Sequence, residues 1–173
     1  RYAIESLRLT PPSFEGQKVV SWSLSAPGIE RAARFQDGFG NLVHLTALHD
    51  EHDSITIEAT GVVETHDRIG VARGLPEPTP LRVFRRQTPR TAADDAIREL
   101  AFKCKGGCTL DQLHRLMHNV RDAVTYEIGS THTHTSAAEA LADGKGVCQD
   151  CAHIFISAAR VLGIPARYVN GYF

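Results

Sequence analysis

The sequence predicts an α+β protein in which an antiparallel, β-rich N-terminal domain precedes a mainly helical C-terminal domain. In the first half, alternating and β-branched stretches are separated by Gly, Asp and Asn turns, a pattern typical of antiparallel strands. The clearest stretches are Val19–Leu24, Leu42–Thr46 and Ile55–Ile57. Beyond residue 90 the apolar spacing becomes helical. The proline-rich run Gly74–Pro80 lies between these patterns and can sustain neither helix nor central strand. We therefore place the domains at residues 1–80 and 81–173.

The C-terminal half contains three expected helices before its cysteine-rich segment. The first covers residues 91–103, after a basic cluster, Arg82–Arg86, that we interpret as a solvated junction. The second opens with a Thr109/Gln112 capping box and carries expected core residues at helical spacing: Leu113, Leu116, Met117, Val120 and Val124. The third opens with a Ser136/Glu139 capping box and ends at Gly144.

A fourth helix begins where the run Asp143–His153 places Cys148. The first turn of a helix exposes unpaired N–H groups and the positive end of the dipole, which together favour a thiolate over a thiol. Gly144 and Gly146 allow a tight turn here and leave room for a substrate to approach the sulfur. Gly163 and Pro165 stop this helix, and a strand at 166–173 is expected to follow. The pattern predicts a reactive nucleophile at Cys148.

These same residues carry a family resemblance. The segments Gly146–Asp150, Ala152–His153 and Leu162–Tyr172 resemble, in order and spacing, the nucleophile segment of the transglutaminase-like superfamily. Upstream, the resemblance extends to the β-rich region that precedes this core in bacterial members, through Arg8–Pro11, Asp37–Asn41 and Ile55–Glu64. Nearly all of the chain is covered. The resemblance implies the helical half of a papain-like core that lacks most of its sheet.

The resemblance also implies a Cys-His-Asp triad that acts on an amide or ester carbonyl of a peptide or protein through an acyl-enzyme. Cys148 would be the nucleophile, and its backbone N–H would face the developing oxyanion. Gln149 would point towards that oxyanion or into solvent, and Asp150 would accept hydrogen bonds from N–H groups of the first helical turn. The family carries its His and Asp on strands beyond Phe173, so we expect this chain by itself to be inactive.

Three histidines of this chain could in principle replace the missing base. His153 follows Cys148 by five residues, which separates them by about 7.5 Å along a helix and makes a direct hydrogen bond unfavourable. His132 and His134 lie in a Thr/Ser-rich loop and are expected to be solvated.

Two functions of other classes remain open. Cys148 and Cys151 form a C-x-x-C pair that could act as a dithiol redox site, although such a site favours a strand directly before the pair, where this sequence predicts a helix. A noncatalytic binding module whose β domain holds a partner is the third possibility.

A zinc site is weakly indicated by four residues, Cys104, Cys108, His114 and His118. The ligand types are suitable, but the gap between the cysteines and the histidines is too short for finger-type sites. We therefore expect free thiols and no metal. No phosphate-binding glycine loop is recognised either, so no cofactor is expected.

Composition limits the classes of partner. With 42% hydrophobic residues and a formal net charge of -1, the chain can bury a core but offers no general attraction for nucleic acid or anionic membranes. No apolar run approaches the roughly 20 residues of a membrane span, and with no secretory signal recognised we expect a cytoplasmic location. An unfinished sheet exposes strand edges, so a homodimer or a segment swap is also expected. The sequence leaves open the substrate and the choice between hydrolysis and transamidation.

Overall fold

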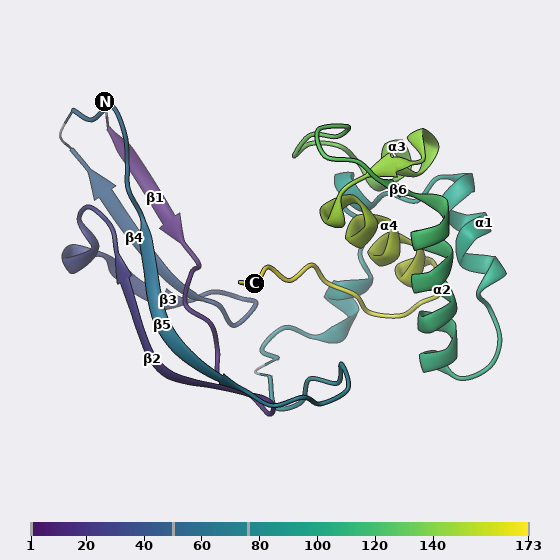
Figure 1. Ribbon diagram of the computed structural model, residues 1–173, viewed down its shortest axis with the longest axis horizontal. Coiled ribbons are helices and arrows are strands. Elements are labelled where there is room, and N and C mark those ends of the chain that lie inside the picture. Colours follow the sequence, from purple (N-terminus) through teal and green to yellow (C-terminus); the bar gives the residue numbers. More distant parts are fainter. Residues whose placement is uncertain (1, 50, 76, 173) are drawn as a thin grey trace. The chain divides into compact units, whose positions relative to one another are not determined.

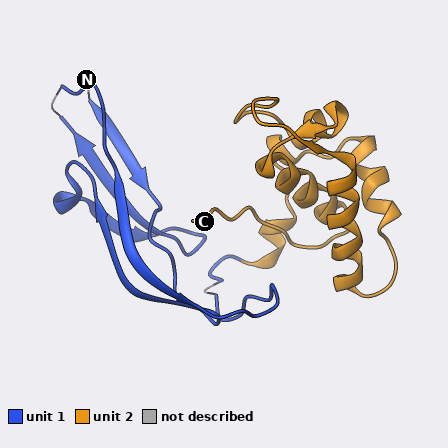
Figure 2. Cartoon of the chain, viewed as in Figure 1, with its two compact units in different colours: residues 1–79 blue, residues 80–173 orange. Residues whose placement is uncertain are grey.

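Strands fill the first half of the chain and helices the second, which confirms the α+β class. The computed structural model describes residues 2–49, 51–75 and 77–172. The chain divides into two compact units, residues 1–79 and 80–173, drawn in different colours in Figure 2. Among the described residues, no helix has both the length and the apolar character needed to cross a bilayer.

The first unit contains two small antiparallel arrangements of strands (Figure 1). In the three-stranded sheet, β4 (Leu42–Leu48) lies between β1 (Ala3–Leu7) and β3 (Ala33–Gln36). The second arrangement pairs β2 (Gln17–Ser25) with β5 (Glu58–Thr65). A Cβ at Gly61 would meet the indole of its cross-strand partner Trp22 at 2.3 Å, so this close pairing requires glycine. A short 3-10 helix, η1 (Ile29–Arg31), connects β2 to β3.

The strand predictions succeeded where the alternating pattern was longest. The expected strands at 19–24 and 42–46 lie within β2 and β4. The expected strand at 55–57 is wrong, because the ladder with β2 begins only at Glu58. Both β1 and β3 were missed. All four residues of β3 are exposed, so this strand has no buried face to produce a pattern and is defined by its pairing with β4.

The turn between β3 and β4 is organised by one carboxylate. Asp37 accepts hydrogen bonds from the backbone N–H groups of Phe39 and Asn41 at 2.9 and 3.0 Å. Arg8 donates to the same side chain through Nε at 2.9 Å and holds the pKa of Asp37 well below its usual range. The ion pair therefore joins the segment after β1 to this turn.

Four α-helices form the second unit: α1 (Asp95–Lys103), α2 (Thr109–Ala123), α3 (Ala137–Asp143) and α4 (Cys148–Val161). Helix α4 contacts the other three, as Figure 1 shows. Its apolar face meets theirs in a core whose fully buried members include Ile97, Leu116, Ala140, Ile154 and Ala158. Two 3-10 helices, η2 (Leu81–Arg85) and η3 (Pro89–Thr91), precede α1. The first residue of the central helix of this unit is Cys148.

Several local predictions for this unit need correction. Helix α1 begins at Asp95, because Asp94 caps it by accepting from the N–H of Ile97, and residue 91 belongs to η3. Thr109 is the first residue of α2 rather than its cap, so the proposed capping box is wrong. Met117 is 51% exposed and lies outside the core. By contrast, the Ser136/Glu139 capping box and the end of α3 at Gly144 are confirmed.

The arginines of the basic cluster Arg82–Arg86 are exposed, as expected of a solvated junction, but the cluster also packs through Phe84. Within it Phe84 is 6% exposed, and its carbonyl accepts hydrogen bonds from Arg160 Nε at 2.9 Å and from the backbone N–H of Ala166 at 3.1 Å. The same guanidinium donates to Thr91 Oγ1 at 2.8 Å and to the Ala166 carbonyl at 2.9 Å. Arg160 therefore joins the start of this unit to the segment that follows α4.

The strand expected at 166–173 is not present in the described residues up to 172. The Ala166 N–H donates a hydrogen bond to the Phe84 carbonyl at 3.1 Å, but this segment forms no strand ladder with another described segment. A strand is defined by its pairing, so an extended sequence pattern alone does not produce one.

Candidate active site around Cys148

Helix α4 begins at Cys148, as predicted. Val147 is the N-cap, with an extended backbone at φ -115°, and the Cys148 side chain is exposed. The chain reaches this point through a left-handed Gly144 (φ 64°) and a two-residue strand, β7 (Lys145–Gly146). That strand pairs in parallel with β6 (Thr125–Tyr126), an interaction the sequence did not indicate. The turn before the thiol is therefore held by hydrogen bonds from a neighbouring segment.

Asp150 is the most constrained side chain at this site. It is 1% exposed, and its Oδ2 accepts from the backbone N–H of Val147 at 2.8 Å and from Thr131 Oγ1 at 2.6 Å. The hydrogen bond to Val147 agrees with the expectation that Asp150 serves backbone N–H groups at the helix start. The other carboxylate oxygen, Oδ1, has no hydrogen-bond partner among the described residues.

Gly146 lies against the buried side chain of Asp150. Its φ is not in the left-handed region, and a Cβ would lie 2.8 Å from Asp150 Cβ and 2.9 Å from Asp150 Oδ2. The missing side chain therefore makes room for a buried carboxylate, and the expectation that it also leaves room for a substrate stays a prediction. Gly144 does serve the tight turn, because its φ of 64° favours glycine. Gln149 is half-buried beside Cys148, and its role towards the oxyanion stays a prediction.

No histidine is hydrogen-bonded to Cys148 in the part of the chain that the structure describes. His153 is 8% exposed, its ring centroid lies 5.4 Å from that of Tyr168, and its Nδ1 is unpaired among the described residues. Burial and the nearby Arg90 lower the pKa of His153, against an opposing effect of Asp150. His132 and His134 are exposed, as expected, and His134 Nδ1 lies 3.3 Å from Arg90 Nη2.

The remaining cysteines differ in their surroundings. Cys151 is half-buried, and burial, the charge of Asp150 and the neighbouring Cys148 all raise its pKa. Cys104 is fully buried, with Sγ 3.4 Å from the Leu100 carbonyl, whereas Cys108 is exposed. In the described part of the chain all four cysteines are free, and no three His, Cys, Asp or Glu side chains are placed to hold a metal ion.

Thr131 is the residue at this site that sequence reasoning missed. It lies 19 residues before Asp150, in the loop between β6 and α3. No periodicity or capping pattern connects two positions so far apart. The sequence hint to Thr131 is its place directly before His132, in the Thr/Ser-rich loop that contains His132 and His134.

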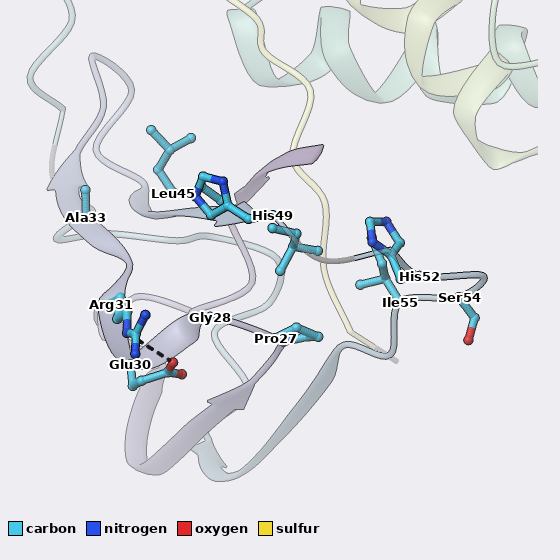
Figure 3. A pocket seen from close by; sticks show the side chains of 12 residues that line it. Pro27, Gly28, Glu30, Arg31, Ala33, Leu45, His49, His52, Ser54 and Ile55 are labelled. Atoms are coloured by element: carbon cyan, nitrogen blue, oxygen red, sulfur yellow. Dashed lines mark ion pairs between the residues drawn. The ribbon is translucent and has the colours of Figure 1, made fainter. Parts of the chain in front are cut away.

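The first unit carries a separate hollow of about 700 Å³. Figure 3 shows the His49 ring beside Leu45, and His52 beside Ile55 in another part of the lining. None of the residues predicted for the active site lines it.

The chain matches the sequence models of two described families. Residues 92–173 match the sequence model of the Transglutaminase-like superfamily, and residues 1–64 match that of the Bacterial transglutaminase-like N-terminal region. The chain belongs to the transglutaminase-like superfamily. The segment of the superfamily core present here includes helix α4 and Cys148.

Curated relatives and a solved structure extend the match. An uncharacterized protein of Mycobacterium leprae is 28% identical over 95% of this chain and 62% of its own length. An uncharacterized protein of Mycobacterium tuberculosis is 29% identical over 95% of this chain and 58% of its own length. The crystal structure of a candidate cysteine protease from Cytophaga hutchinsonii matches with a TM-score of 0.71 at 24% identity, over 95% of this chain and 60% of that one. The chain thus spans about three fifths of the proteins it matches.

Proposed function

We propose that Cys148 is the nucleophile of a transglutaminase-like cysteine hydrolase or peptidase that cleaves an amide bond of a peptide or protein. The observation that carries this proposal is an exposed thiol at the first residue of a 14-residue helix. The first N–H groups of a helix lack intrahelical acceptors, and the dipole there favours a thiolate. Membership of the superfamily supports the same assignment.

In the proposed reaction, Cys148 Sγ attacks the substrate carbonyl carbon and a carbon–sulfur bond forms. The carbonyl oxygen becomes an oxyanion that the Cys148 backbone N–H faces, with Gln149 as a candidate second donor. Collapse of this intermediate breaks the carbon–nitrogen bond, and the leaving amine takes a proton from a general acid. Water or an amine then accepts the acyl group.

The proton transfers of this reaction call for a base, which the resemblance assigns to a histidine oriented by an aspartate. No described histidine is hydrogen-bonded to Cys148. We therefore propose that residues 1–173 by themselves acquire an acyl group from an activated donor but do not turn over amides. Poor leaving groups need general-acid help, whereas a p-nitrophenolate leaves without it.

The test uses p-nitrophenyl acetate with the chain as it stands, followed by mass spectrometry of the cysteine-containing peptides. We expect one burst of p-nitrophenolate and acetylation of Cys148 ahead of Cys108, which is also exposed and serves as the internal control. The Cys148→Ala variant should show no burst. Equal labelling of both residues, or a burst that survives in Cys148→Ala, would overturn the assignment.

The two alternatives make different predictions. A redox role for Cys148 and Cys151 requires a reversible disulfide at a defined potential in a glutathione titration, which Cys151→Ser would abolish. A noncatalytic binding module requires that Cys148→Ala leave the affinity for its partner unchanged. A homodimer or a segment swap, the absence of nucleic-acid binding and the cytoplasmic location also stay predictions.

A further inference from the structure

We propose that Thr131 and Asp150 are positioning residues that fix the turn before Cys148, so that the Cys148 backbone N–H stays oriented towards the substrate oxyanion that forms when Sγ attacks the carbonyl carbon. This inference rests on the proposed role of Cys148 as a nucleophile. It assigns to Thr131 a role in acyl transfer through its hydrogen bond to Asp150, which lies 19 residues further along the chain.

The first step of the argument is the pair of hydrogen bonds to one buried oxygen. Asp150 Oδ2 accepts from the N–H of Val147 at 2.8 Å and from Thr131 Oγ1 at 2.6 Å. Val147 is the residue directly before Cys148, so the first hydrogen bond sets the orientation of the chain that enters the helix. Gly146 packs against the same side chain so closely that an added Cβ would lie 2.8 Å from Asp150 Cβ.

The second step concerns the loop that carries Thr131. Its start is paired to the strand before Cys148, because Glu127 N–H donates to the Gly146 carbonyl at 3.0 Å and Lys145 forms an ion pair with Glu127 at 2.9 Å. Near its end, the Thr135 N–H donates to the His132 carbonyl at 2.9 Å, and the His132 N–H donates to Thr135 Oγ1 at 2.9 Å. Thr131 joins this ordered loop to Asp150, so the loop and the start of α4 form one hydrogen-bonded unit.

The third step is a conflict between charge and geometry. A carboxylate near a thiolate disfavours the thiolate by like-charge repulsion. Burial raises the pKa of Cys151, and the charge of Asp150 raises it further. A side chain that acted through its charge would therefore oppose the nucleophile. Asp150 is useful to the site only through what its oxygens hold in place, which makes the two effects separable by substitution.

The experiment compares two reagents on Cys148. Acetylation by p-nitrophenyl acetate passes through an oxyanion that needs the backbone N–H, whereas alkylation by iodoacetamide forms no oxyanion. We expect Thr131→Val to slow acetylation about tenfold, the loss of one hydrogen bond to a charged partner, while alkylation changes less than about twofold. Thr131→Ser keeps the hydroxyl and should restore the acetylation rate.

Substitutions at Asp150 complete the test. Asp150→Asn removes the charge but keeps an acceptor oxygen, so acetylation should be retained, whereas Asp150→Ala removes the acceptors and should slow it. Thr131→Val with wild-type rates for both reagents would overturn the inference, as would a parallel fall of both rates with reduced helical circular dichroism. If wild-type Cys148 is not acetylated ahead of Cys108, the proposed function itself fails, so the two failures are distinguishable.

Discussion

The turn before Cys148 has room for only a hydrogen atom at position 146, and Gly146→Ala tests that packing directly. The new Cβ would lie 2.8 and 2.9 Å from Asp150 Cβ and Oδ2, well inside the roughly 3.5–4.0 Å at which such atoms pack favourably. This clash can be relieved by a backbone shift, and overpacking of this kind costs about 1–3 kcal/mol. It can also be relieved by movement of Asp150, which breaks charge-assisted hydrogen bonds that contribute a similar free energy. We expect a loss of about 2 kcal/mol in the free energy of unfolding.

Urea unfolding followed by far-ultraviolet circular dichroism measures this loss, because all four α-helices lie in the second unit. The matched control is Gly171→Ala, where a Cβ would meet nothing within 4 Å and φ is not left-handed. We expect this control to stay within about 0.5 kcal/mol of the wild type. Equal stabilities of the two variants would refute the claim that Gly146 is required by the buried carboxylate.

Four further predictions concern the second unit. Arg160→Met should lower the free energy of unfolding by about 2–4 kcal/mol, because it removes every donor to the acceptors that the guanidinium joins. Arg160→Lys should lower it by less, because an ammonium can still donate to some of these acceptors although not to all of them; urea midpoints of both variants equal to that of the wild type would contradict this. Ile154→Ala should cost about 2–5 kcal/mol and Ile154→Val about 0.5–1.5 in the same assay, since the site is fully buried. The pKa of His153 lies below 6.5 in the fold, so the unfolded chain binds more protons below that pH and stability should fall on acidification from about 6.5; His153→Gln should flatten this dependence. If the segment 164–172 pairs with a second copy, sedimentation velocity will show a mass that rises with concentration, and a constant monomer mass would exclude this pairing.

The elements that could be predicted from the sequence depend on interactions between near neighbours. The Ser136/Glu139 capping box and the left-handed Gly144 define α3 within a few residues, and the start of α4 follows from that end. The errors occurred where the outcome depends on distant partners. Met117 has helical spacing suited to a core, but its side chain is 51% exposed. The segment after Ala166 has strand character but finds no partner strand among the described residues.

At the candidate site, local sequence is enough to indicate the nucleophile candidate, the turn and the helix that begins there, because helix starts and glycine turns are set by contacts within about four residues. The interactions that hold them in place depend on the folded chain. Thr131 and Asp150 lie 19 residues apart, and Arg160 and Phe84 lie 76 apart. Such pairs form only when whole helices pack, and the energy that selects them comes from burial shared by many side chains, which no local pattern records.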